Sequence, residues 1–113
     1  MYLLIIILYN ENYVREILKK FLEIDVRGAT LIRSKGMASL LSEEVPIFTS
    51  LRRMFEETNL GENYTIFSAI KTEETLNKAT EAVLEIVKDI DKPGTGIMIV
   101  VPVIKIYGLA QKF

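Results

Sequence analysis

The sequence predicts a single α+β domain of ferredoxin-like topology, a βαβ-βαβ sandwich in which a four-stranded antiparallel sheet carries two helices on one face. Three observations lead to this prediction. A chain of 113 residues has room for one hydrophobic core. Its apolar patterns follow the order β-α-β, a long insertion between strands 2 and 3, and β-α-β. Right-handed crossovers in both halves place the two helices on the same face of the sheet.

The first half opens with an apolar run at residues 2–9 (YLLIIILY), typical of a strand that is buried on both faces. Asn10 suits the N-cap of a following helix. The apolar stripe of this helix is formed by Val14, Ile17, Leu18, Phe21 and Leu22. We expect the helix to end near Asp25, and Gly28 to mark the entry to a second strand at residues 29–34.

The insertion covers residues 37–61. Pro46 suits the first position of a short amphipathic helix inside it. The apolar stripe of that helix would be formed by Ile47, Phe48, Leu51, Met54 and Phe55. Because a connection of this length in a small domain is more often functional than structural, we expect this stripe and Arg52 to contact a partner protein. Packing of the stripe on the protein's own oligomer is the alternative.

The second half repeats the pattern of the first. Residues 63–70 (NYTIFSAI) predict a third strand, and Thr72 suits the N-cap of a second long helix. The buried face of this helix would consist of Leu76, Ala79, Val83, Ile86, Val87 and Ile90. Residues 97–106 (IMIVVPVIKI) predict the last strand, in which Pro102 indicates an edge position or a bulge.

The first and last strands are apolar at nearly every position, although two helices can cover only one face of a sheet. A bare apolar face of more than a few hundred Å² is rarely tolerated in a monomer. We therefore expect a second subunit to cover this face, and a charge placed there, at Ile6 if its side chain points that way, to prevent assembly. Folding of the insertion over the face is the alternative.

Composition limits the function classes. The chain has no cysteine and no histidine, which removes the commonest nucleophiles, proton shuttles and transition-metal ligands. We expect a protein that is not an enzyme and holds no metal. Only carboxylates such as Glu43, Glu44 and Glu62 could bind a hard cation, so an enzyme or a metal-tolerance trimer is the least favoured interpretation. A net charge of −1 argues against nucleic-acid binding. No run is long enough to span a membrane and no signal-peptide pattern is present, so we expect a cytoplasmic protein.

Three segments, in this order, resemble the P-II (nitrogen regulatory) signal-transduction family. They are Val14-Arg15-Glu16, then Arg27-Gly28-Ala29-Thr30 with Lys35-Gly36, and finally residues 91–103 (DKPGTGIMIVVPV). The resemblance implies a homotrimer whose sheets pack together at its centre. It also implies that adenine nucleotides bind between subunits, and that the insertion, the T-loop of the family, signals to a membrane transporter, an enzyme or a regulator.

The resemblance also implies a set of ligand-binding residues. Gly94 and Gly96 match the family's glycines that let backbone amides approach phosphate oxygens, and Thr30 matches the residue beside the adenine pocket. The candidate ligand-binding residues are Thr30, Lys35, Gly36, Lys92, Gly94, Thr95 and Gly96. A helix stop followed by a turn would explain the two glycines equally well.

The chain lacks three cations of the family pattern. Ile97 stands where a lysine follows the second glycine, and Gly108 and Ala110 stand where the family has two arginines. Since a triphosphate is seldom held without cations, we expect weak nucleotide binding in which AMP or non-nucleotide ligands match ATP. No cofactor is required. The alternative function is a ferredoxin-like module that senses an amino acid or another metabolite without binding nucleotides.

Overall fold

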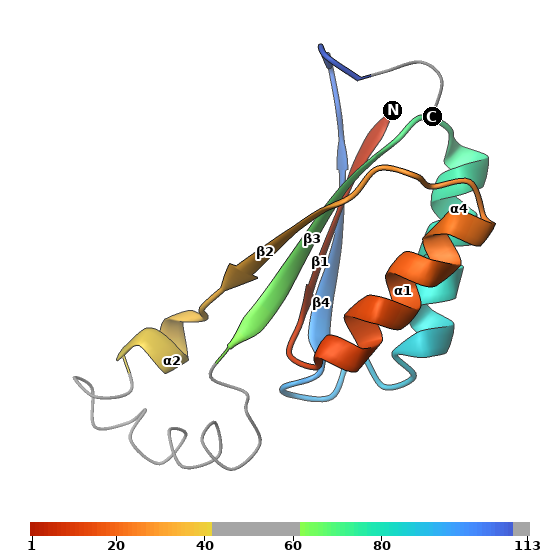
Figure 1. Ribbon diagram of the computed structural model, residues 1–113. Helices are drawn as coiled ribbons and strands as arrows, with labels where there is room; N and C mark the ends of the chain where they lie inside the picture. The colour runs from red at the N-terminus through yellow and green to blue at the C-terminus, as the bar shows by residue number, and fades with distance from the viewer. Residues whose placement is uncertain (42–61, 110–113) are drawn as a thin grey trace.

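The computed structural model describes residues 1–41 and 62–109. In this part of the chain a four-stranded antiparallel sheet forms one layer, and helices α1 and α4 form a second layer against one face of it (Figure 1). The elements are β1 (Tyr2–Leu8), α1 (Glu11–Glu23), β2 (Thr30–Ser34), α2 (Met37–Leu41), β3 (Asn63–Ile70), α4 (Glu73–Ile86) and β4 (Gly96–Pro102). The strand order is β2-β3-β1-β4, which confirms the predicted ferredoxin-like arrangement.

The pairing register assigns each strand residue to one face of the sheet. Ile6 lies opposite Ile66 on β3 and Met98 on β4, whereas Ile5 lies opposite Phe67 and Ile99. Because successive side chains of a strand point to opposite faces, these two rows belong to different faces. Ile6 is fully buried beneath the helices. It therefore does not point to the uncovered face, and Ile5 does.

The hydrophobic core lies between the sheet and the two long helices. The predicted stripes supply it, because residues at intervals of three and four positions share one side of a helix. Its fully or almost fully buried members include Leu4, Ile6, Leu8, Val14, Ile17, Phe21, Ile66, Ile70, Ala79, Val83 and Val87. Packing among these side chains holds α1 and α4 against the sheet.

Both helices begin at the predicted caps. The side chain of Asn10 accepts a hydrogen bond from the amide of Asn12 at 2.9 Å, and that of Thr72 accepts one from the amide of Thr75 at 3.1 Å. Each bond satisfies a backbone donor that the first turn of a helix leaves unpaired. The two caps thereby set where α1 and α4 leave the sheet.

Helix α1 ends near Asp25, as predicted. Asp25 adopts a left-handed conformation with φ 68°, which glycine usually supplies at this position. The amide of Val26 donates to the carbonyl of Phe21 at 2.7 Å, and that of Asp25 donates to Leu22 at 3.3 Å. This pair of bonds is a Schellman motif, which ends the helix just before Asp25, and Gly28 lies beyond it, shortly before β2.

Two boundaries differ from the sequence-based expectation, and one short helix was not expected. Helix α4 ends at Ile86. Val87 and Ile90, which were expected on its buried face, pack against the core from the turns that follow the helix. Strand β4 ends at Pro102, which has no amide hydrogen to continue a ladder, and its edge position is confirmed. The short helix α2 was not predicted. The predicted helix with Ile47, Phe48, Leu51, Arg52 and Phe55 lies outside the described residues.

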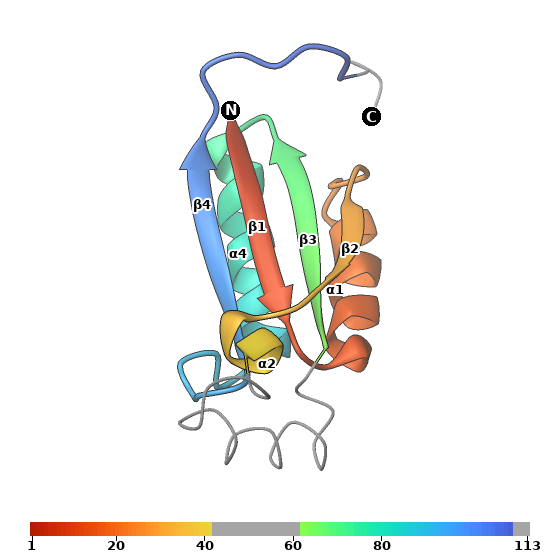
Figure 2. The same cartoon turned by 90° about the vertical axis from the view of Figure 1, so that its left-hand side faces the viewer.

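The face of the sheet opposite α1 and α4 is apolar over β1 and β4, and these helices leave it open (Figure 2). We call it the open face. Its row on β1 is formed by Leu3, Ile5 and Ile7, and its row on β4 by Ile97, Ile99 and Val101. Ile97, Ile99 and Val101 are 51%, 41% and 37% exposed. Among the described helices, none is both long and apolar enough to cross a membrane.

Candidate functional site

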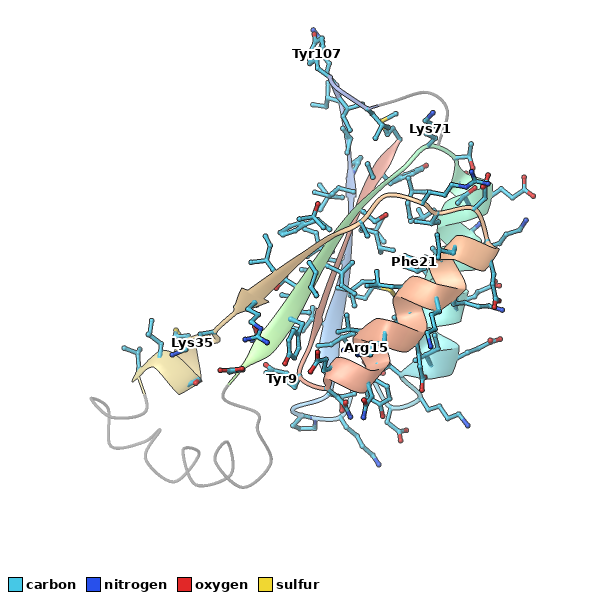
Figure 3. The ribbon with its side chains drawn as sticks, viewed as in Figure 1. Tyr9, Arg15, Phe21, Lys35, Lys71 and Tyr107 are labelled. Carbon is cyan, nitrogen blue, oxygen red and sulfur yellow. The ribbon has the colours of Figure 1, made fainter. Side chains whose placement is uncertain are left out.

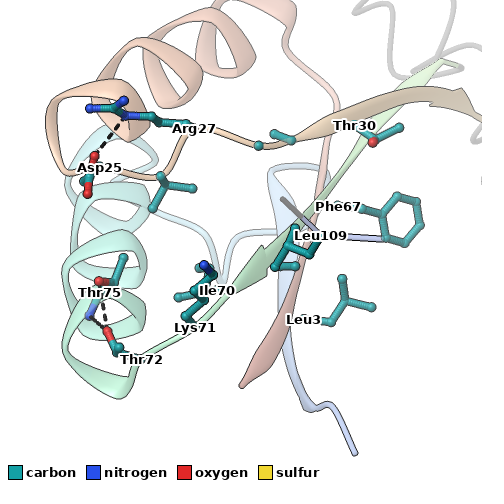
Figure 4. A pocket seen from close by; sticks show the side chains of 14 residues that line it. Leu3, Asp25, Arg27, Thr30, Phe67, Ile70, Lys71, Thr72, Thr75 and Leu109 are labelled. Atoms are coloured by element: carbon teal, nitrogen blue, oxygen red, sulfur yellow. Dashed lines mark hydrogen bonds and ion pairs between the residues drawn. The ribbon is translucent and has the colours of Figure 1, made fainter. Parts of the chain in front are cut away.

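A cavity of about 610 Å³ lies where the loop after α1 meets the end of β3 and the start of α4 (Figure 4). We call it the first cavity. It is lined by Leu3, Asp25, Val26, Arg27, Gly28, Ala29, Thr30, Phe67, Ala69, Ile70, Lys71, Thr72, Thr75 and Leu109. Thr30 is the one predicted ligand-binding residue among the lining residues. Leu109 comes from the segment after β4, which crosses the end of the sheet to reach the cavity (Figure 2).

A hydrogen bond from a buried serine and an exposed ion pair hold the loop that forms one wall of the first cavity. The hydroxyl of Ser68 on β3 donates to the carbonyl of Gly28 at 2.7 Å, and Ser68 is 2% exposed. The guanidinium of Arg27 lies 2.9 Å from the carboxylate of Asp25. Together with the Schellman motif at Asp25, these contacts fix the course of residues 25–29 against the sheet.

The walls of the first cavity combine an apolar surface with a few polar groups, as in many small-molecule sites. Three charged residues line it, namely Asp25, Arg27 and Lys71, and the first two form an ion pair with each other. The hydroxyl of Thr72 already caps α4 and also donates to the hydroxyl of Thr75 at 3.0 Å. Lys71 forms no ion pair with any residue in the described ranges.

A second cavity, of about 490 Å³, lies beside the turns between α4 and β4. Lys92, Gly94 and Gly96 line it, together with Ile97, and Thr95 lies between the two glycines. The ammonium group of Lys92 is 3.5 Å from the carboxylate of Asp89, and both side chains are largely exposed. This cation is therefore already paired within its own turn, where solvent weakens the interaction.

Both glycines of this segment are required by the fold itself. Gly94 has φ 80°, which side chains other than glycine rarely adopt. A Cβ atom on Gly96 would lie 2.7 Å from the carbonyl oxygen of Ile7 and 2.8 Å from the Leu8 side chain. The turn and the close approach of β4 to β1 thus explain the glycines without a ligand.

Lys35 and Gly36 lie at the end of β2, where the insertion begins (Figure 3). Below them the hydroxyl of Ser34 bonds to the side-chain oxygen of Asn63, and it lies 2.8 Å from the hydroxyl of Thr65. The carbonyl of Gly36 accepts a hydrogen bond from the amide of Leu40 at 3.0 Å, which starts α2. Lys35 itself is exposed.

One chain does not bring the predicted ligand-binding residues together. Thr30 lies on β2 and Gly96 on β4, which are the two edge strands of the sheet. Three inter-strand spacings separate these edges, which is at least about 14 Å at 4.7–4.9 Å per spacing. Thr30 at the first cavity, Lys35 and Gly36 at the root of the insertion, and Lys92 to Gly96 at the second cavity form three separate groups.

Sequence reasoning did not find several residues of the first cavity. Lys71 stands directly before the cap of α4 and Asp25 directly after α1, so each looks like an ordinary surface charge at a helix end. Ser68 and Leu109 carry no signal of their own. Only the pairing of β2 with β3 places the loop after α1 beside the end of β3 and makes a cavity there.

The described residues contain no group of three or more His, Cys, Asp or Glu side chains placed to hold a metal ion. Of the carboxylates named for a hard cation, Glu62 is exposed at the start of β3, while Glu43 and Glu44 lie outside the described residues.

Comparison with known proteins gives a result at the level of the fold. No protein-family model matches the chain, and no curated protein matches it. Among solved structures, that of Arabidopsis thaliana PII bound to citrate superposes with a TM-score of 0.60. The match covers 90% of this chain and 76% of the plant protein, at 16% sequence identity. The chain has a P-II-like fold. The resemblance seen in the sequence is confirmed at this level.

Proposed function

We propose that the protein is a non-catalytic regulator that works as a homotrimer. It binds a small effector, an adenine nucleotide or a similar molecule, in clefts between subunits, and it contacts a partner protein through residues 37–61. The observation that carries this proposal is the apolar open face, which stands on a P-II-like fold and has no cover among the described helices.

The open face supports self-association because its exposed side chains form a continuous patch. On β1 and β4, Ile5 pairs with Ile99 and Ile7 pairs with Ile97, so the apolar rows lie side by side. Packing this patch against copies of itself removes it from water, at about 25 cal/mol for each Å² of apolar surface. A polar ligand or a nucleic acid would not bury this apolar surface favourably.

The division of the candidate site between two edges supports a cyclic oligomer. In a ring built by rotation, each subunit presents one surface to the next subunit and a different surface to the previous one. The β2 edge of one subunit, with Thr30, can then adjoin the β4 edge of its neighbour, with Gly94 and Gly96. A site that is incomplete in one chain becomes complete between two.

The partner contact rests on the resemblance and on the exposed apolar start of the insertion. Met37 and Leu40 on α2 are 70% and 65% exposed. The remaining proposed contacts, Ile47, Phe48, Leu51, Arg52 and Phe55, lie outside the described residues. A transporter or an enzyme is the partner class that the resemblance implies.

Multi-angle light scattering tests the oligomer. We expect a mass three times that of the 12.9 kDa chain at micromolar concentration. A single species of the monomer mass would contradict the proposal and favour folding of the insertion over the open face.

Calorimetry with AMP and ATP tests the ligand. We expect AMP to bind at least as tightly as ATP, because Ile97, Gly108 and Ala110 replace three cations. Each charge-assisted contact is worth roughly 1.5–3 kcal/mol, so the loss of two corresponds to about two to four decades of affinity for a triphosphate. A dissociation constant for ATP below one micromolar would contradict this expectation. It would mean that a lysine has replaced the missing charges.

A metabolite sensor without nucleotide binding is the second candidate. The exposed Ile97 beside the second cavity favours it, since this position offers an anion no charge. A thermal-shift screen of nucleotides, amino acids, cyclic dinucleotides and citrate separates the two candidates, because a ligand that binds only the folded protein raises its melting temperature. A shift with an amino acid or with citrate, and none with any nucleotide, would select the second candidate.

A further inference from the structure

We propose that Lys71 binds the negatively charged group of the effector inside the first cavity. The ligand class is then a small molecule with one anionic group, a carboxylate or a phosphate monoester, on an apolar or aromatic body. The inference rests on the proposed function, because the first cavity contains Thr30, the residue assigned there to the effector. It goes beyond that function by placing the anionic group on this cavity instead of on residues 92–96.

The charges of the cavity point to an anion. Asp25 and Arg27 form an exposed ion pair at 2.9 Å, and Lys71, which is also exposed, is the third charged residue of the lining and has no carboxylate partner within it. Lys71 takes part in none of the ion pairs between residues of the described ranges. It also lines a neighbouring cavity with Ile106 and Leu109, so its flexible side chain stands between two hollows.

The acidic residues closest to it in sequence do not occupy this charge. Glu73 and Glu74 follow in the first turn of α4, but neither lines the first cavity. Glu74 is instead 3.5 Å from Lys78, one turn further along the helix. Each of these carboxylates is exposed, and solvent screens its effect on Lys71.

The remaining lining suits an apolar or aromatic body. Its apolar part is contributed by Leu3, Val26, Ala29, Phe67, Ala69, Ile70 and Leu109. A volume of about 610 Å³ lies within the 300–1,000 Å³ typical of small-molecule sites. Thr30 lines the cavity from the start of β2, opposite Phe67, and Lys71 lines it from just after β3, so a ligand that contacts both has to extend along the cavity (Figure 4).

Residues 92–96 are poorer anion binders by comparison. Lys92 is paired with Asp89, Ile97 supplies no charge, and the two glycines are required by the turn and by β1. A ligand with a single anionic group therefore gains more from Lys71.

The experiment uses two matched pairs of probes, AMP with adenosine and benzoate with benzyl alcohol. In each pair the second member lacks the anionic group. Binding to the 113-residue protein is measured by calorimetry and by NMR shift changes, for the unsubstituted protein and for Lys71→Gln, Lys71→Arg and Lys92→Gln.

We expect Lys71→Gln to weaken binding of the anionic member of at least one pair by roughly ten- to a hundredfold, the effect of losing one charge-assisted contact. Its uncharged counterpart should bind as before, Lys71→Arg should retain the affinity, and Lys92→Gln should change nothing. Shift changes should centre on residues 26–30 and 70–75. An effect with AMP alone identifies a phosphate ligand, and an effect with benzoate alone a carboxylate.

Equal binding of both probe pairs by the unsubstituted protein and Lys71→Gln would overturn the inference, as would a loss confined to Lys92→Gln. In either case a trimer that still binds AMP leaves the proposed function standing. A trimer that binds none of the four probes, while the thermal-shift screen finds another ligand, overturns only the role of Lys71. A monomer that binds no ligand overturns both.

Discussion

The two faces of the sheet are built from the same strands and end in opposite states. On the helix-covered face, Leu4, Ile6 and Leu8 of β1 are fully buried. On the open face the alternate residues of the same strand, with their partners on β4, remain in contact with water. The described residues therefore complete one hydrophobic layer and leave the second apolar face exposed.

This difference follows from how many helical stripes the chain supplies. Helices α1 and α4 each carry one apolar stripe, and both lie on the same side of the sheet because their crossovers share one hand. An antiparallel sheet whose second face met water would alternate apolar and polar residues. Residues 3–8 and 97–101 do not alternate, so the sequence pattern is that of a sheet buried on both faces, whereas the two long helices of the described residues cover one face.

Two neighbouring residues of β1 give the largest expected effects. Ile6→Asp places a charge among fully buried side chains and should destabilise the chain by several kcal/mol, so that urea unfolding finds little or no folded protein. Ile5→Asp places the same charge on the open face, where it stays hydrated in a monomer. We expect it to fold and to lose the trimer in light scattering.

These two variants decide whether the faces differ as described. A trimer that persists in Ile5→Asp would exclude the open face as the interface. Equal loss of folding in both variants would mean that monomers do not fold without their partners.

The fold could be predicted from the sequence because its signals are local and agree with one another. Asn10 and Thr72 cap the helices as expected, and β3 has the predicted bounds. The end of α1 near Asp25 was predicted as well, but the left-handed conformation of Asp25 was not, because the sequence pattern assigns this conformation to glycine. Such an exception depends on the Schellman bonds and on burial of Val26, which appear only in three dimensions.

The candidate site was less predictable than the fold. The resemblance named residues on both edge strands, but one chain keeps Thr30 and Gly96 apart. The first cavity instead joins residues 25–30 to Lys71 and Leu109, which are distant in sequence and carry no motif. Their proximity follows from strand pairing and from the path of the last segment, neither of which a residue pattern records.

Substitution of glycine by alanine at two positions, one tightly packed and one open, tests how tightly the helix-covered face is packed. Gly96→Ala directs a Cβ atom to 2.7 Å from the Ile7 carbonyl and 2.8 Å from Leu8, so β4 must shift. We expect a loss of about 1–3 kcal/mol in the free energy of unfolding. Gly28→Ala is the matched control, because a Cβ atom there meets nothing within 4 Å.

The control should change stability by less than about 0.5 kcal/mol, with a slight gain from the less flexible unfolded chain. Equal losses of unfolding free energy in Gly96→Ala and Gly28→Ala would show that the loss comes from the restricted backbone of the new alanine and not from the packing of its Cβ atom. In that case the close approach of β4 to β1 would not define this face.

A buried serine gives the smallest expected effect and connects the helix-covered face to the first cavity. Ser68 is 2% exposed, and its hydroxyl donates to the carbonyl of Gly28 in the loop that forms one cavity wall. Ser68→Ala leaves this carbonyl without its donor and should lower the free energy of unfolding by about 1 kcal/mol.

Thr80→Ala on α4 is the control, since its bond to the Asn77 carbonyl is exposed to water. We expect the control to be neutral or slightly stabilising, because alanine favours the helix. Because Gly28 itself lines the cavity, Ser68→Ala should also weaken binding of any effector found in the thermal-shift screen. Unchanged effector affinity in a destabilised Ser68→Ala protein would show that this loop does not shape the ligand site, and would move the site to the β4 edge.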